Sequence, residues 1–282
     1  MRMKIFGKYG KVSEEKVDYG KALWKPESGA GKHVVTKSRF KCPENFFPVV
    51  VDDFFNDPEM IVDYGKSLQK EQMRGQPGKR SQSLWEINNL LANAIMLKIM
   101  SCYYDLEYTN VYWQTSDMRF QEVPRFSENK NDVRNKGWIH QDDEFTEGMF
   151  QLAGLIYLTP DIDPDSGTSL YNAKSNKHHR VYSKDVLYKN GSFDKEEYIK
   201  SQIKHEENFE EKLRVQNIFN RLVMYDTSEW HRANSYYNGD GKDARLTLGF
   251  FTGNINPFTP LKRIKNSEYE SIIKLQIGKN EN

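Results

Sequence analysis

Two different spacings of hydrophobic residues divide the chain at about residue 110. Before that point apolar residues recur every three or four positions, and the clearest stretch, Leu84 to Met100, predicts an amphipathic helix. A shorter helix is predicted after Asn56, because a capping side chain, Pro58 in the first turn and helically spaced apolar residues follow one another. The remainder of the chain has the short apolar runs of strands.

The predicted strands are short aliphatic or aromatic runs bounded by turn residues. They cover residues 46–51, 111–120, 152–159, 168–171, 179–182, 219–225 and 244–251. Several short strands with turn signals between them are typical of a sandwich or a barrel. We therefore expect a mostly β fold with flanking helices, of the α+β class.

Three further segments complete the expected organisation. Residues 1–40 are polar and aperiodic, which predicts an extended arm before a single domain over 41–282. Residues 72–80 contain two glycines and a proline, which predicts a loop. Residues 193–215 are rich in Lys and Glu with apolar residues four apart, which predicts a surface helix inserted in the domain. We expect His205 to lie on the solvated side of that helix, far from any metal.

Composition places the chain among ordinary globular proteins. Hydrophobic residues make up 37% and charged residues 29%, and the formal net charge of +1 predicts no general attraction to nucleic acid or to an anionic membrane. The N-terminus lacks the apolar run of a signal peptide, and no stretch approaches the ~20 apolar residues that cross a bilayer. We expect a cytoplasmic protein with a small-molecule or peptide partner; the sequence does not determine its oligomeric state.

The two cysteines, Cys42 and Cys102, are too few for a disulfide framework or a cysteine zinc site. A single bridge between them stays open. The candidate metal ligands therefore come from the six histidines and the acidic residues.

His140 is the most informative histidine, because Asp142 follows it two residues later. Residues two apart in an extended segment point to the same side, so this imidazole and this carboxylate can bind one ion. His231, after a predicted strand, can complete a facial triad, which leaves open positions on non-haem iron(II). Such pairs also arise by chance, as His205 with Glu207 shows, so the pair needs support from the residues that follow it.

Arg245 gives that support. It opens a strongly apolar strand fourteen residues after His231, where an arginine needs a planar anionic partner, and a carboxylate fits its guanidinium group. Alternation along the strand places Thr247 on the same face, where its hydroxyl can reach the same anion. A structural aspartate at the strand edge is the alternative partner, and the spacing alone leaves both open.

In this order, the histidine–aspartate pair, the distal histidine and the Arg-x-Thr strand resemble the iron(II)- and 2-oxoglutarate-dependent dioxygenases, and most closely their prolyl 4-hydroxylase-like branch. Other short motifs of that branch correspond to Val49–Phe55, Ile156–Thr159, Asp165–Thr168 and Arg221–Val223. The resemblance runs from about residue 47 to residue 251, and it implies a double-stranded β-helix, or jelly roll.

Two positions depart from the pattern of this branch. Arg119-Phe120 stands where Arg-Tyr is usual, so a tyrosine hydroxyl is missing there. Ser166-Gly167 stands where two glycines are common, which puts the shape of that turn in question but not the chemistry.

The resemblance implies that His140, Asp142 and His231 hold iron(II), with 2-oxoglutarate as co-substrate and dioxygen as oxidant. It implies no catalytic residue beyond these metal ligands. The implied activity is that of an oxidoreductase, a hydroxylase whose substrate is unidentified.

The resemblance also assigns the co-substrate site. Arg245 matches the arginine that binds the C5 carboxylate of 2-oxoglutarate, and Thr247 matches the accompanying hydroxyl. Tyr157 matches a tyrosine that often binds the same carboxylate; a core tyrosine with its hydroxyl at the rim is the equal alternative.

Two other functions stay open on the sequence. One is a metal-dependent hydrolase or epimerase that uses the same triad with zinc or manganese on a jelly roll, and it would not need Arg245. The other is a binding module that kept the fold and lost catalysis, which the intact triad argues against. Formation of succinate from 2-oxoglutarate separates both from an oxygenase.

Overall fold

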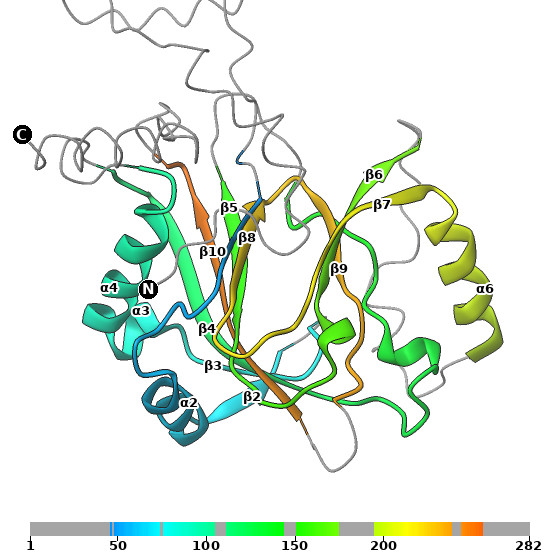
Figure 1. Ribbon diagram of the computed structural model, residues 1–282, viewed down its shortest axis with the longest axis horizontal. Helices are drawn as coiled ribbons and strands as arrows, with labels where there is room; N and C mark the ends of the chain where they lie inside the picture. The colour runs from blue at the N-terminus through cyan, green and yellow to red at the C-terminus, as the bar shows by residue number, and fades with distance from the viewer. Residues whose placement is uncertain are drawn as a thin grey trace, which may run out of the picture.

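In a computed structural model of the protein, the described residues are 46, 48–73, 76–104, 111–143, 151–174, 195–238 and 244–255. The predicted arm over residues 1–40 and the predicted strand over 179–182 lie outside them. The described residues form two antiparallel sheets that face each other, with helices on the outer sides of both (Figure 1).

The larger sheet has seven strands in the order β1-β8-β5-β10-β4-β3-β2, and the smaller sheet has the order β7-β6-β9. Two facing antiparallel sheets of this kind form the predicted jelly roll, so the mostly β fold class is confirmed. The strands are β1 (Val49–Val51), β2 (Lys70–Gln72), β3 (Lys79–Ser81), β4 (Thr115–Pro124), β5 (Leu152–Tyr157), β6 (Thr168–Ala173), β7 (Phe209–Val215), β8 (Leu222–Asp226), β9 (Trp230–Ala233) and β10 (Ala244–Gly253).

The helices lie on the two outer sides of this sandwich. Three of them, α2 (Pro58–Ser67), α3 (Leu84–Ile87) and α4 (Asn89–Met100), lie beside the larger sheet, and α6 (Lys195–Glu206) lies beside the smaller one (Figure 1). Short 3-10 turns cover Val133–Asn135 and Pro164–Ser166. Within the described part of the chain, no helix is long and apolar enough to span a bilayer.

Local capping chemistry explains where the helices start. The carboxylate of Asp57 accepts a hydrogen bond from the Met60 amide at the start of α2. The helix predicted over Leu84 to Met100 is divided at Asn88, because the Asn88 side chain accepts from the Leu91 amide and so begins α4 as a new helix.

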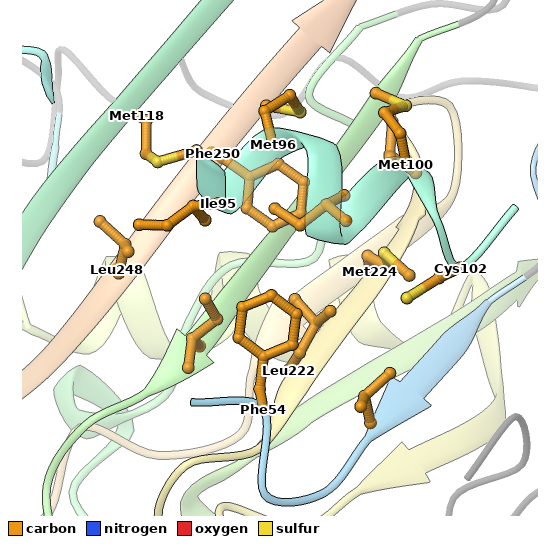
Figure 2. Close-up of a cluster of buried hydrophobic side chains, with 14 of the residues drawn as sticks. Phe54, Ile95, Met96, Met100, Cys102, Met118, Leu222, Met224, Leu248 and Phe250 are labelled. Atoms are coloured by element: carbon orange, nitrogen blue, oxygen red, sulfur yellow. The ribbon is translucent and has the colours of Figure 1, made fainter. Parts of the chain in front are cut away.

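The main hydrophobic core lies between the helices and the larger sheet. From β10, Leu248 and Phe250 point toward α4, where Ile95 and Met96 meet them (Figure 2). Each such side chain contributes about 1.5–3 kcal/mol when it is fully buried. Gly65 allows α2 to approach this sheet, because a Cβ atom at that position would lie 2.4 Å from the Phe120 ring.

The opposite face of the larger sheet carries the polar residues. Along β10 the core residues alternate with Arg245, Thr247, Gly249 and Phe251, which line a cavity between the two sheets. A slip of one residue in the pairing of β10 would exchange these two sets, so the apolar core fixes which side chains reach the cavity.

Two sequence predictions were wrong in part. The helix predicted over 193–215 ends at Glu206, and its second half is β7, which pairs with β6. Leu213 and Val215 alternate with polar residues and are buried in a core cluster with side chains of the larger sheet, which an inserted surface helix would not allow. The loop predicted over 72–80 overlaps the start of β3, which pairs with the edge strand β2.

Candidate metal centre and its cavity

The backbone brings His140 and His231 side by side. Each donates its amide hydrogen to the carbonyl of the other, with N···O distances of 3.0 and 2.8 Å, so the two residues form an isolated antiparallel bridge that continues the pairing of β9. Directly paired residues carry their side chains on the same face of a sheet. The two imidazole rings accordingly lie 4.4 Å apart between centroids.

Asp142 completes a cluster with these histidines. Its amide donates to the Thr227 carbonyl over 3.0 Å, which returns the chain toward the start of β9. Asp142 Oδ1 lies 3.6 Å from His140 Nε2, and Asp142 Oδ2 lies 3.4 Å from His231 Nε2. Among the described residues these three form the group of histidine, cysteine and acidic side chains with a metal-ligating arrangement, and their donor atoms lie within 4.8 Å of one another.

Both imidazoles are oriented by backbone carbonyls. Nδ1 of His140 lies 2.7 Å from the Trp138 carbonyl, and Nδ1 of His231 lies 2.9 Å from the Glu229 carbonyl. A carbonyl only accepts, so each Nδ1 carries the proton and each Nε2 turns a lone pair toward the Asp142 carboxylate. This is the orientation that metal-ligating histidines take from their hydrogen-bond partners.

The cluster opens into a cavity of about 180 Å³ between the two sheets. Its polar lining includes four basic side chains and two acidic ones, and these are Arg80, Arg119, Lys136, Arg245, Asp117 and Asp142. Its apolar and aromatic lining comes from both sheets and from α6, and includes Trp138, Ala153, Leu155, Tyr198, Tyr225, Tyr236 and Phe251.

Arg245 reaches this cavity as a buried cation, and the described residues provide no acidic partner for it. It is 4% exposed and donates from NH1 to the carbonyls of Ser166 and Ser235 over 2.7 and 3.2 Å, while its buried Nε has no hydrogen-bond partner. Burial lowers the pKa of its guanidinium below the ordinary value. No carboxylate of the described residues forms an ion pair with it, so the alternative of a structural aspartate finds no support there.

The other two residues predicted for the co-substrate lie next to Arg245. Thr247 is buried, lines the cavity and pairs with Tyr157 across β5 and β10. The Tyr157 hydroxyl donates to Thr168 Oγ1 over 2.8 Å, and it is Thr168 that lines the cavity. Burial raises the pKa of Tyr157, and the positive charge of Arg245 opposes that rise.

His205 corrects an expectation from the sequence, because it is buried rather than exposed. It is 4% exposed, its ring stacks on Trp138 with 4.5 Å between centroids, and its Nε2 lies 2.7 Å from the Ile139 carbonyl. The charged neighbours of His205 in sequence suggested the solvated face of α6, but the stack against Trp138 turns this residue inward. His205 is not part of the metal-ligating cluster and instead fixes α6 against the segment before His140.

We expect the protein to lose stability as the pH falls below about 6.5, in part because of His205. Burial lowers the pKa of this imidazole in the folded state, so the unfolded chain binds the proton more readily. The contribution of His205 is present above its unfolded pKa and is lost as the pH falls through its folded pKa. Denaturant unfolding of the metal-free protein between about pH 7.5 and 5.5 measures this slope, and His205→Gln, which keeps a donor for Ile139, should flatten it. An unchanged slope in the variant would contradict the assignment.

Sequence reasoning missed several residues of the cavity. Tyr225 lies near the end of β8 with its ring 4.7 Å from the His231 ring, and burial followed by the charge of Asp142 raises its pKa well above the ordinary value. Its place on the cavity face could have been read from alternation along the predicted strand. Arg80 carried no such signal, because it lies in a segment that was predicted to be a loop.

Comparison with known proteins identifies one matching family and several similar solved structures. A family model described as "Family of unknown function (DUF6445)" matches residues 41–252. No curated protein matches the sequence. Among solved structures, HygX from Streptomyces hygroscopicus with nickel and 2-oxoglutarate bound is similar at 10% identity and a TM-score of 0.45, covering 74% of this chain and 84% of that one.

Two prolyl hydroxylases are also among the similar structures. One, from Trichoplax adhaerens in complex with a hypoxia inducible factor peptide fragment, has 11% identity and a TM-score of 0.40, covering 73% of this chain and 83% of that one. The other, a prolyl-4-hydroxylase from Pseudomonas putida, has 11% identity and a TM-score of 0.38, covering 73% of this chain and 92% of that one.

Proposed function

The chain belongs to the DUF6445 family, whose function is unknown, and we propose that it is an iron(II)- and 2-oxoglutarate-dependent oxygenase that hydroxylates a small-molecule or peptide substrate. One observation carries this proposal. A buried arginine for which the described part of the chain offers no acidic partner shares one cavity with a His-x-Asp and distal histidine cluster, so the cavity would offer a metal site and a carboxylate site together.

The donor set of the cluster fits iron(II). Two imidazoles and one carboxylate form a facial arrangement that leaves positions for further ligands, as non-haem iron oxygenases require. Both Nε2 atoms face the carboxylate oxygens at 3.4 and 3.6 Å, so a cation placed between them could bind both imidazoles and the carboxylate. Two ligands bound at ~2.0–2.2 Å to one ion can lie up to about 4.4 Å apart, so both distances are compatible with a shared ion.

Arg245 and Thr247 would bind the distal carboxylate of 2-oxoglutarate. The guanidinium would gain the anionic partner that it lacks, and the Thr247 hydroxyl would donate a further hydrogen bond. Tyr157 would join them if its hydroxyl turned from Thr168 Oγ1 toward the same carboxylate. With its distal carboxylate bound in this way, the co-substrate would have its keto acid end free to bind at the metal cluster.

The surrounding residues would hold and shield the reactants. Bound iron(II) would supply the activation of dioxygen, which protein side chains cannot carry out. The Trp138 and Glu229 carbonyls keep the protons of both imidazoles on Nδ1, and Leu155, Tyr225 and Phe251 present hydrophobic surface that limits water in the cavity. The motifs of the sequence favour the prolyl 4-hydroxylase-like branch for this chemistry.

The buried Arg245 favours the oxygenase over the main rival. A hydrolase or epimerase that uses zinc or manganese in the same triad predicts no need for an unpaired arginine beside it. Burying a cation without a counter-charge destabilises the fold, so its presence favours a carboxylate-bearing co-substrate.

The test is succinate formation. We expect metal-free protein supplied with iron(II), 2-oxoglutarate and dioxygen to release succinate, and to release none when iron(II) or dioxygen is left out. Calorimetric titration of 2-oxoglutarate into the zinc-loaded protein measures binding without turnover. Absence of both succinate and 2-oxoglutarate binding would contradict the proposal and favour the hydrolase.

A further inference from the structure

A second arginine, Arg80 on β3, lines the same cavity on the other side of β10 from Tyr157. The strand register places both in one row, because Tyr157 pairs with Thr247, Thr247 with Gln121, and Gln121 with Arg80. Neighbouring strands lie about 4.8 Å apart, so the backbone of Arg80 lies roughly 10 Å from that of Thr247. The two arginines therefore serve different parts of the cavity.

Arg80 has few hydrogen-bond partners among the described residues. Its NH2 group donates to Gln121 Oε1 over 3.3 Å, its buried Nε has no hydrogen-bond partner, and the described residues offer it no ion pair. Burial lowers the pKa of its guanidinium, and Asp117 and then Asp142 counter this through their charges without contact. A neutral amide at long hydrogen-bond distance is a weak partner for a cation in this setting.

Arg119 also lines the cavity, and unlike Arg80 it has strong hydrogen-bond partners. The Arg119 Nε donates to both carboxylate oxygens of Asp117 over 2.9 and 2.7 Å, and NH1 donates to the Ser81 carbonyl over 3.0 Å. Asp117 is thus committed to Arg119. The other acidic side chain among the described residues that line the cavity is Asp142, which belongs to the metal cluster.

With a metal ion and 2-oxoglutarate bound, a count of the charges in the cavity also singles out Arg80. Asp142 and the keto acid carboxylate of 2-oxoglutarate would balance a divalent metal ion, and the distal carboxylate would balance Arg245. Asp117 balances Arg119. Among the described residues, the half-buried Arg80 then remains as a cation without an opposite charge, and the exposed Lys136 also lines the cavity.

We infer that the substrate is acidic and that Arg80 binds its oxyanion group, a carboxylate or a phosphate. This inference rests on the proposed function, because it assigns the remaining cation of the cavity to the substrate of that reaction. An oxyanion would accept charge-assisted hydrogen bonds from the guanidinium and would replace the weak contact with Gln121. Arg80 would thereby orient the substrate relative to the metal cluster.

The experiment compares acidic and neutral probes of similar shape. Phenylacetate and phenyl phosphate, with phenylacetamide as the neutral analogue, are titrated into protein loaded with zinc and saturating 2-oxoglutarate, which occupies Arg245 and prevents turnover. Ligand-observed NMR measures the dissociation constants. We expect at least one acidic probe to bind about tenfold or more tightly than the amide, and the two acidic arms to separate carboxylate from phosphate recognition.

Variants assign that preference to one residue. Arg80→Gln should remove the preference for acidic probes, and Arg80→Lys, which keeps the charge, should retain part of it. Arg214→Gln is the matched control, because it also removes one arginine, but Arg214 lies on β7 in an exposed pair with Glu211 away from the cavity. An equal affinity for the amide in the wild type, or a full acidic preference in Arg80→Gln, would overturn the inference.

The same titrations without zinc and 2-oxoglutarate separate the two proposals. If 2-oxoglutarate does not bind, the proposed function fails, while a difference in acidic preference between wild type and Arg80→Gln still supports an anion site at Arg80. If 2-oxoglutarate binds and that difference is absent, the oxygenase assignment stands and the acidic substrate is excluded.

Discussion

Replacing His231 with alanine is expected to abolish high-affinity metal binding and, with it, succinate formation. The variant leaves one imidazole and one carboxylate, and the His140 ring loses the neighbour that lies 4.4 Å away. We expect affinity for iron(II) or manganese(II) to fall by about 100-fold or more, since removing even a residue that supports a metal ligand costs about 10–100-fold. Calorimetric titration of the metal-free protein measures the change.

His205→Ala is the matched control for this experiment. His205 and His231 are both buried, at 4% and 6% exposure, and each ring contacts a backbone carbonyl. Loss of the stack on Trp138 should lower the stability of His205→Ala while one metal ion per chain still binds. Equal loss of metal binding in both variants would show that the triad is wrongly assigned.

Replacing Arg245 with lysine is expected to weaken 2-oxoglutarate binding by about 30-fold or more while metal binding stays nearly intact. Lysine keeps the charge but loses the planar group that matches a carboxylate, and lost charge-assisted hydrogen bonds cost about 1.5–3 kcal/mol. The Ser166 and Ser235 carbonyls would also lose the donor that holds them. Titration of 2-oxoglutarate into zinc-loaded protein gives the affinity.

Arg221→Lys provides the comparison for that variant. Arg221 is equally buried, but its Nε donates to Asp52 over 2.6 Å, so its charge already has a structural partner. We expect this variant to lower the free energy of unfolding and to leave 2-oxoglutarate affinity close to that of the wild type. A larger effect on affinity from Arg221→Lys than from Arg245→Lys would remove Arg245 from the co-substrate site.

The sequence predicted those parts of the fold in which hydrophobic alternation is strong. Strands β5, β8 and β10 lie close to their predicted positions, because each carries a continuous or alternating apolar pattern that only a buried strand satisfies. The juxtaposition of His140 and Asp142 followed from their spacing of two. Their meeting with His231 depends on the backbone pairing of segments far apart in the chain, which spacing alone does not determine.

The failures have a common physical origin in contacts between distant segments. His205 has charged neighbours, yet the Trp138 ring and the Ile139 carbonyl bury it. Residues 209–215 have apolar positions that suit a helix as well as a strand. They form a strand because their backbone pairs with the edge of β6. Arg80 reaches the cavity only because β3, next to the edge strand β2, pairs with β4.

The order of strands in the larger sheet predicts a gradient of hydrogen exchange across the cavity. β10 pairs along its whole length with β4, and from Thr247 to Thr252 also with β5, so the amides near Arg245 should exchange slowly. β3 contacts β4 through two residue pairs and is followed only by the edge strand β2, so the amides near Arg80 should exchange sooner. One wall of the cavity is therefore rigid enough to keep a fixed ligand geometry, while the other can adjust to ligands of different size.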